Sequence, residues 1–188
     1  MHPVLRKLEG GDRRSVGRSE RVVADVLGNP DLFGVLVTGL SSENAILRMR
    51  AADAMEKISL MHPEYLWPHH DFLIEQAARS DQKEVRWHLA QMLPRLKLSA
   101  TERLLVVNIL LTYFADSSSI VKTCAMQALA DLARQTPKLR PSIQAHLQEL
   151  TAIGTPAMKA RGRKLLAELK EESPTTITSG HRSTRRTL

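Results

Sequence analysis

The sequence predicts an all-α protein, an α-solenoid in which about four helical hairpins form a right-handed superhelical stack. Hydrophobic residues make up 43% of the 188 residues but aromatic residues only 4%, a composition that suits packed helices better than strands. Glycine and proline number nine each, fewer than a β-rich chain with many tight turns needs. The third observation is a helical pattern that recurs four times at nearly constant spacing.

The repeated pattern is seen in residues 85–96, VRWHLAQMLPRL, which align without gaps on three other segments. The copies start at residues 47, 85, 121 and 158, so successive starts are 38, 36 and 37 residues apart. Each copy begins with an apolar residue and a cation: Leu47-Arg48, Val85-Arg86, Val121-Lys122 and Met158-Lys159. Apolar residues return at the ninth and twelfth positions, and a mostly small residue stands at the fifth. We expect these apolar positions to face one continuous core, because a single hairpin cannot bury its apolar stripe alone.

A first helix is predicted before each copy, and the predicted ranges are 31–40, 69–78, 102–115 and 141–153. An earlier helix over 19–27 would cap the N-terminal side of the array. The highly charged segment KARGRKLLAELKEE, residues 159–172, would cap the other side. Terminal repeats need such a polar outer face for solubility.

Residues at the expected helix ends support these assignments. Ser99 and Glu102 have the spacing of a capping box, in which each side chain accepts a hydrogen bond from the other residue's backbone N–H. Asp81 is placed to cap the helix of the second copy. Pro94 lacks a backbone N–H and predicts a kink or an early end in that helix. The last helix pair is separated by a stop and a start signal, Gly154-Thr155-Pro156.

The repeat domain is predicted over residues 19–172, with units near 31–60, 64–97, 99–134 and 138–172. Residues 1–18 are interpreted as a basic N-terminal segment, and residues 173–188 as a basic tail that is disordered because it is poor in apolar residues. The formal charge of +7 is concentrated at these two ends. The single cysteine excludes an internal disulfide and favours a cytoplasmic location. No apolar run reaches the roughly 18 residues of a membrane span, so we expect no membrane association.

The repeated units resemble HEAT repeats, the helical hairpins of armadillo-type solenoids. That family places an aspartate in the turn between the two helices and a Val-Arg pair about four residues later. Asp81 with Val85-Arg86 matches this pattern, and Asp116 with Val121-Lys122 matches it with lysine in place of arginine. In the first unit Ser42 or Glu43 stands where the aspartate is expected, and the fourth unit lacks it.

The resemblance covers roughly residues 31–172 and has two implications. The first is a structural ladder in which the cations of the copies reach the turn aspartates; its members are Arg48, Arg86, Lys122, Lys159, Asp81 and Asp116. The second is that the second helices line a concave surface. The resemblance is specific for the fold and not for the function, because arrays of this kind mostly serve as scaffolds.

The side of the second helices that does not face the core carries five basic and four acidic side chains. A mixed surface of this kind favours a protein partner over a nucleic acid, and tryptophan and arginine are preferred anchors in such interfaces. Trp87 is the leading candidate, with partial burial against the neighbouring hairpin as the alternative. The predicted partner-binding residues are Arg50, Asp53, Trp87, His88, Gln91, Arg95, Gln127, Arg161 and Lys164. The sequence therefore predicts a non-catalytic scaffold or adaptor.

Two other functions are considered. A nucleic-acid-binding protein is the second hypothesis, because basic ends attract phosphates. An enzyme is the third, because some alkylpurine DNA glycosylases are built of HEAT-like repeats and use tryptophans and an aspartate on a basic concave face. In this chain Trp87 is the one candidate tryptophan on that face, and Asp53 and Asp131 stand on neighbouring units. No catalytic residue is therefore assigned.

Two groups of residues have the types found in reactive or metal sites. His88 and Cys124 occupy the fourth position of adjacent copies, but no acid is placed to orient a nucleophile–base pair. The segment MHPEYLWPHHD contains potential metal ligands: His62, His69, His70 and Asp71. Adjacent histidine side chains diverge, and a carboxylate in this position is accounted for by the N-terminus of a helix. We therefore expect no bound metal and no cofactor.

Overall fold

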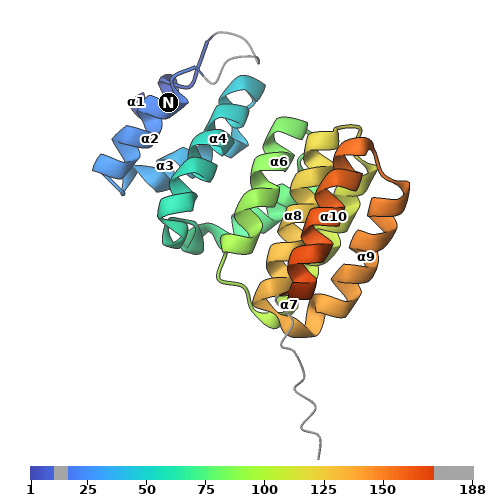
Figure 1. The fold of residues 1–188 in the computed structure, drawn as a ribbon. Helices are drawn as coiled ribbons and strands as arrows, with labels where there is room; N and C mark the ends of the chain where they lie inside the picture. The colour runs from blue at the N-terminus through green and yellow to red at the C-terminus, as the bar shows by residue number, and fades with distance from the viewer. Residues whose placement is uncertain (11–16, 172–188) are drawn as a thin grey trace, which may run out of the picture.

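The computed structural model describes residues 1–10 and 17–171, and all regular elements in these ranges are helical (Figure 1). The α-helices are α1 (Pro3–Arg6), α2 (Ser19–Gly28), α3 (Leu32–Thr38), α4 (Ala45–Met61), α5 (His70–Arg79), α6 (Lys83–Met92), α7 (Ala100–Thr112), α8 (Ser119–Gln135), α9 (Arg140–Ile153) and α10 (Pro156–Glu171). Short 3-10 turns follow or join them: η1 (Gly39–Ser41), η2 (Pro63–His69), η3 (Leu93–Arg95), η4 (Tyr113–Ala115) and η5 (Pro137–Leu139). The all-α prediction is confirmed. In the described part of the chain, no helix has both the length and the apolar character needed to cross a membrane.

Consecutive helices pack together as four pairs: α3 with α4, α5 with α6, α7 with α8, and α9 with α10. The second helices of these pairs also pack on one another in chain order, and α2 precedes them, so that α2, α4, α6, α8 and α10 form one row (Figure 1). Behind this row, α1 packs against α3 and α5 against α7. Each second helix begins two residues before the copy that predicts it.

Most of the expected helix boundaries are confirmed, and one is wrong. α6 ends at Met92 and continues as η3, because Pro94 cannot donate the next backbone hydrogen bond. The Ser99 backbone N–H donates to Glu102 Oε2 at 2.6 Å and the Glu102 N–H donates to Ser99 Oγ at 3.3 Å, which completes the capping box. Asp81 does not cap α6: Gln82 stands immediately before the helix and makes no side-chain cap, so Asp81 lies one residue too early.

The apolar first, ninth and twelfth positions of the four copies are buried, except Leu166, which packs against the core from a half-buried position. The small fifth positions bring helices close together. A Cβ placed on Gly162 would overlap Thr151 Oγ1 on α9 and come within 2.9 Å of Met126 Cε on α8. α10 therefore depends on a glycine at the point where it crosses both neighbours.

The start of the chain, predicted as a basic segment before the repeat domain, contains a short helix that packs on the other helices. Val4, Leu5 and Leu8 are at most 8% exposed and belong to the same hydrophobic core as the later helices. The apolar residues of α1 are few and the surrounding charges are many, which is why composition alone concealed the helix. Residues 11–16 and the predicted tail at 173–188 lie outside the described residues.

Candidate functional site

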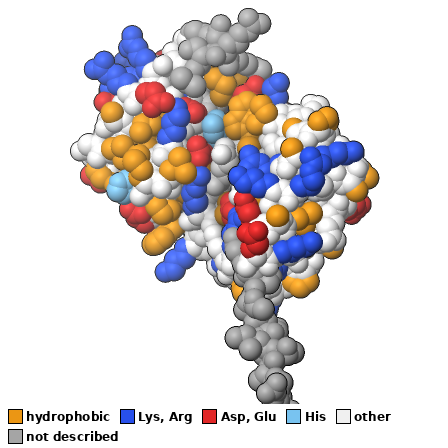
Figure 2. All heavy atoms as spheres, viewed as in Figure 1, with side chains coloured by type: hydrophobic (Ala, Val, Ile, Leu, Met, Phe, Trp, Pro, Cys, Tyr) orange, Lys and Arg blue, Asp and Glu red, His pale blue; other side chains and the backbone are white. Residues whose placement is uncertain are grey.

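The predicted partner-binding residues belong to α4, α6, η3, α8 and α10. We call the side of α4, α6, α8 and α10 that is turned away from the first helices the second-helix face. Figure 2 is seen from the same direction as Figure 1, and in it basic, acidic and hydrophobic side chains are mixed over the described surface. A nucleic-acid groove requires a concentrated stripe of positive charge. The described part of this view does not have that arrangement.

Arg50 is buried and does not belong to an open surface, so its assignment to partner binding is wrong. It is 2% exposed, and its Nη1 donates to the backbone carbonyl oxygens of Leu8 at 2.9 Å and Gly10 at 2.5 Å. A buried guanidinium requires several acceptors, and the carbonyls of the N-terminal segment provide them. Arg50 thus fastens the start of the chain to α4.

Asp53 is also buried, and it links α4 to α2. It is 8% exposed and accepts hydrogen bonds from Ser19 Oγ at 2.6 Å and from Lys57 Nζ at 3.0 Å. Lys57 extends the link through an ion pair with Glu20. The Asp53 carboxylate, which was predicted to bind a partner, therefore makes contacts within the chain instead.

Arg95 connects η3 to α4 through three hydrogen bonds. Its Nη2 donates to Glu56 Oε1 at 2.8 Å, and its Nη1 donates to the Glu56 carbonyl oxygen at 3.0 Å and to Ser59 Oγ at 2.7 Å. Glu56 and Ser59 are buried. Because its donors are already engaged, Arg95 is better described as a contact between neighbouring pairs than as a partner-binding residue.

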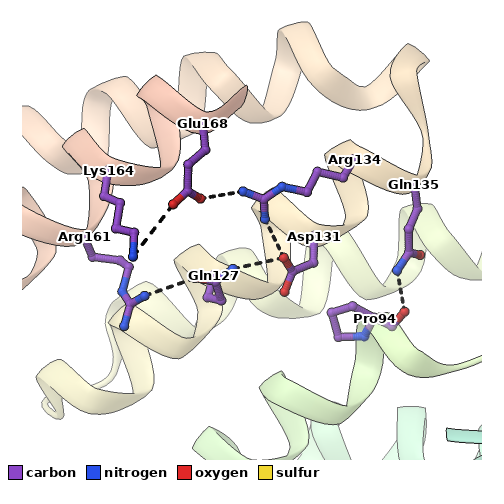
Figure 3. Close-up of polar contacts among 8 residues, drawn as sticks. All are labelled: Pro94, Gln127, Asp131, Arg134, Gln135, Arg161, Lys164 and Glu168. Carbon is purple, nitrogen blue, oxygen red and sulfur yellow. Dashed lines mark hydrogen bonds and ion pairs between the residues drawn. The ribbon is translucent and has the colours of Figure 1, made fainter. Parts of the chain in front are cut away.

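A third network joins α8 to α10 and is drawn in Figure 3. The guanidinium of Arg134 lies between two carboxylates, donating to Asp131 Oδ1 at 2.7 Å and to Glu168 Oε2 at 2.6 Å. Arg161 donates to Gln127 Oε1 at 3.2 Å, and Gln127 in turn donates to Asp131 Oδ1 at 3.0 Å. Two of these contacts, Arg134–Glu168 and Arg161–Gln127, join α8 to α10, so the network fixes the position of α10 on α8.

Lys164 and Gln135, also drawn in Figure 3, make further polar contacts of α10 and α8. Lys164 approaches Glu168 at 3.8 Å from the exposed side of α10. Gln135 donates to the Pro94 carbonyl oxygen at 2.8 Å and so connects α8 to η3. Of the cations predicted to contact a partner, Arg161 and Lys164 are the exposed ones.

Between these charged networks lies an uncharged region that we call the central patch: Trp87, His88 and Gln91 on α6, and Thr123 and Cys124 on α8. All five residues are partly exposed. The Trp87 and His88 rings meet edge to face with centroids 5.7 Å apart, and Gln91 Nε2 donates to the Trp87 carbonyl oxygen at 3.2 Å. Trp87 also packs against the core, so the indole is held in place while part of it faces solvent.

The two titratable groups of the central patch are both neutral at neutral pH. Burial lowers the pKa of His88 against the opposing effect of the Asp53 and Glu56 charges. Burial raises the pKa of the Cys124 thiol to about 11 in spite of the nearby Arg161 cation. No hydrogen bond joins His88 to Cys124 within the described residues, and a thiol with so high a pKa is a poor nucleophile.

One cation of the predicted ladder, Arg86, reaches a turn aspartate, whereas Arg48 reaches a glutamine of the next turn. Arg86 Nη1 donates to Asp116 Oδ2 of the next pair at 2.8 Å, and its guanidinium lies 5.2 Å from the centre of the Tyr113 ring. Arg48 Nε donates to Gln82 Oε1 of the next pair at 3.0 Å. Both arginines also donate to backbone carbonyls of the turn that precedes their own helix, those of Ser80 and Ser42.

The remaining members of the ladder make no such contact. In the described chain, Lys122, Lys159 and Asp81 have no side-chain hydrogen bond or ion pair, and their assignment to the ladder is wrong. Asp81 instead lines a hollow of about 550 Å³ at the turns, together with Arg48 and Arg86. Gln82 replaces Asp81 as the acceptor because it directly precedes α6 and also donates to the Ala45 carbonyl oxygen at 2.8 Å.

The structure separates the four residues of MHPEYLWPHHD whose types are found in metal sites. His62 pairs with Glu64 at 3.0 Å and stacks on Tyr65, and His69 packs beside Phe33. His70 and Asp71 stay together at the start of α5, and a residue that was assigned only to the capping box, Glu102, joins them. Glu102 is 32 residues from His70 in the sequence, and only the packing of α5 on α7 could reveal their proximity.

Comparisons with known proteins add no relative to this description. No family model, curated protein or solved structure matches the chain.

Proposed function

We propose that this chain is a non-catalytic HEAT-like scaffold that holds a protein partner on its second-helix face, centred on Trp87. The observation that carries the proposal is the central patch. It is uncharged, it contains a partly exposed tryptophan whose position is fixed by packing, and charged residues lie on both sides of it. Protein interfaces have this organisation, with an aromatic centre depleted of charge and a polar rim.

The arrangement of helices supports the HEAT-like part of the proposal. Four helix pairs with regularly spaced second helices, all packed in one row, are what a stack of repeats requires. The contacts of Arg48 and Arg86 with the next turn repeat the same link between successive pairs. We infer a solenoid of about four units, in which the first helices form the opposite surface.

The exposed cations place a basic rim on one side of the partner site. Arg161 and Lys164 lie on α10, beside the central patch, and their side chains reach solvent. On the other side, Asp53 and Glu56 are acidic but buried. We therefore expect a partner with an apolar anchor for Trp87 and acidic residues toward α10. Electrostatic complementarity at such a rim increases the association rate more than the affinity.

The experiment is site-specific photo-crosslinking from the central patch. A photoreactive amino acid is introduced at Thr123, and a matched variant carries it at Glu149, which is exposed on the first helix α9. The proposal expects a defined crosslinked protein from position 123 and not from position 149. Trp87→Ala should remove that product, because truncating a central aromatic anchor typically costs more than about 2 kcal/mol of binding free energy.

Trp67→Ala is the matched control, since Trp67 is the second tryptophan of the chain and is 42% exposed on η2. It should leave the crosslink unchanged. Equal products from positions 123 and 149, or an unchanged product in Trp87→Ala, would contradict the proposal. A product that disappears on nuclease treatment would instead assign the face to nucleic acid.

A further inference from the structure

His70, Asp71 and Glu102 bring three potential metal ligands together on the side of the molecule opposite the second-helix face. His70 Nε2 lies 3.3 Å from Asp71 Oδ1 and 3.2 Å from Glu102 Oε1. All three ligand atoms are within 4.8 Å of one another. His70 and Asp71 belong to the first turn of α5, and Glu102 belongs to the first turn of α7. The cluster therefore spans two neighbouring helix pairs.

The hydrogen bond of His70 Nδ1 orients the ring, so that the other ring nitrogen, Nε2, points toward the two carboxylates. His70 Nδ1 lies 3.0 Å from the Trp67 carbonyl oxygen, which can only accept, so Nδ1 carries a proton. Nε2 is turned to the opposite side, where it lies close to one carboxylate oxygen of Asp71 and one of Glu102. The three ligand atoms converge on one point, and either a proton on Nε2 or a metal ion there would attract both carboxylates.

The same hydrogen bond is the usual support of a metal-binding histidine. Such a ring donates its second N–H to a backbone carbonyl or a carboxylate, which fixes the tautomer and the direction of the free nitrogen. The carbonyl itself is held, because Trp67 belongs to η2 and its Nε1 donates to the Arg95 carbonyl oxygen at 3.2 Å. Glu102 is likewise oriented, since its other oxygen accepts from the Ser99 backbone N–H.

The spacing of the ligand atoms favours a zinc-like ion. Zinc binds imidazole nitrogen and carboxylate oxygen at about 2.0–2.1 Å, so the edge of its coordination tetrahedron is about 3.3 Å. The two nitrogen–oxygen distances of 3.2 and 3.3 Å already match that edge. The nitrogen ligand argues against magnesium and calcium, which prefer oxygen alone. The carboxylate of Asp71 is 90% exposed and free to adjust, and water would complete the coordination.

We propose that His70, Asp71 and Glu102 bind a divalent cation of the zinc class and that this ion joins α5 to α7. The site replaces our expectation that this segment holds no metal. Its role is structural: it links the first helices of two successive pairs, on the side opposite the arginine and glutamate contacts that link the second helices. The proposal does not depend on a partner at the central patch.

The test is zinc binding by the untagged full-length chain after treatment with a chelator. Calorimetric titration with ZnCl₂ should show one saturable site, and zinc should raise the melting temperature because it binds the folded state. His70→Gln and Glu102→Gln should each weaken zinc binding by at least about tenfold. Glutamine at position 102 still completes a capping box, so α7 keeps its start in this variant.

His62→Gln is the matched control, since it removes another surface histidine of the same segment without touching the cluster. It should bind zinc as the parent chain does. Nitrogen-15 chemical shifts of the histidine rings supply the decisive readout, because zinc on Nε2 and a proton on Nε2 give different shifts. No saturable binding, equal weakening by His62→Gln, or a His70 ring that is protonated and indifferent to zinc would overturn the proposal.

Discussion

At the scale of single residues, Arg86 links its own turn to the next helix pair. One guanidinium donates to the Ser80 carbonyl oxygen at 2.6 Å and to Asp116 at 2.8 Å, and it also lies against the Tyr113 ring. Arg86→Ala should lower the free energy of unfolding by about 2 kcal/mol, because it leaves the Asp116 carboxylate without its cation. Urea unfolding followed by circular dichroism measures this change.

A double-mutant cycle separates the ion pair from the other contacts of Arg86. Asp116→Ala combined with Arg86→Ala should destabilise the protein less than the sum of the two single changes. Arg79→Ala provides the comparison, since Arg79 is 76% exposed and pairs along its own helix with Glu75. An effect of Arg79→Ala as large as that of Arg86→Ala would show that the pair has no special role.

Asp116 predicts a loss of stability in acid. Burial by itself would raise the pKa of Asp116, but hydrogen bonds from the Ser118 backbone N–H and from Arg86 outweigh it, so the pKa lies below its ordinary value. A lowered pKa in the folded state means that stability is full above the ordinary value of 3.8 and is lost as the pH falls through the folded value. Asp116→Asn should flatten that part of the curve of unfolding free energy against pH. A parent chain with constant stability from pH 5 to pH 2 would contradict this assignment.

Cys124 should be slow to react with iodoacetamide. With a pKa of about 11, its thiolate fraction at pH 8 is about two orders of magnitude below that of an ordinary cysteine. The alkylation rate, followed by mass spectrometry on the folded chain, should approach that of a free thiol only in denaturant. Rapid alkylation of the folded chain at pH 8 would mean that the thiol is activated, and the central patch would have to be reconsidered as a reactive site.

At the scale of elements, α10 has a glycine, Gly162, where a Cβ would overlap α9. Gly162→Ala would place a methyl group against Thr151 Oγ1, and the resulting overlap costs about 1–3 kcal/mol. The higher helix propensity of alanine offsets at most about 1 kcal/mol of this. We therefore expect Gly162→Ala to lower the midpoint of urea unfolding. In a Thr151→Ala background the same change should become neutral or stabilising, and an equal loss in both backgrounds would contradict the contact.

The elements themselves could be predicted from the sequence because their signals are local. Apolar spacing located the second helices, Pro94 ended α6, and Ser99 with Glu102 started α7. The targets of polar side chains could not be predicted in the same way. Arg50 reaches the Gly10 carbonyl oxygen 40 residues away, and nothing in the sequence near residue 50 indicates an acceptor there. For the same reason, the sequence around His70 could not indicate that Glu102 lies beside it.

The helical period fixes which side of a helix a residue occupies, and Trp87 and His88, which it predicts on the side away from the core, are partly exposed. It does not fix how deep the residue lies. Arg50 and Asp53 share the face but are covered by α2 and the chain start, whose position depends on contacts between distant segments.

At the scale of the whole molecule, the row of second helices predicts a gradient of stability. α4, α6 and α8 each have another helix of the row on both sides, whereas α10 and the short α1 lie near the two ends of the described chain. Amide hydrogen exchange should therefore be slowest in the three central second helices and faster toward both ends. Exchange measured by mass spectrometry tests this expectation. Uniform protection from α1 to α10, or the highest protection in α1 or α10, would contradict an array whose units support their neighbours.

The contacts between pairs also affect how such a chain can change in length. Arg48 reaches the turn of the next pair, Arg86 does the same one pair later, and each of these arginines also donates to the turn before its own helix. A gene duplication that inserted one whole unit of about 37 residues would supply both halves of every new contact. A partial insertion would separate donors from acceptors. Growth or shortening by complete units is therefore the evolutionary path that this architecture tolerates.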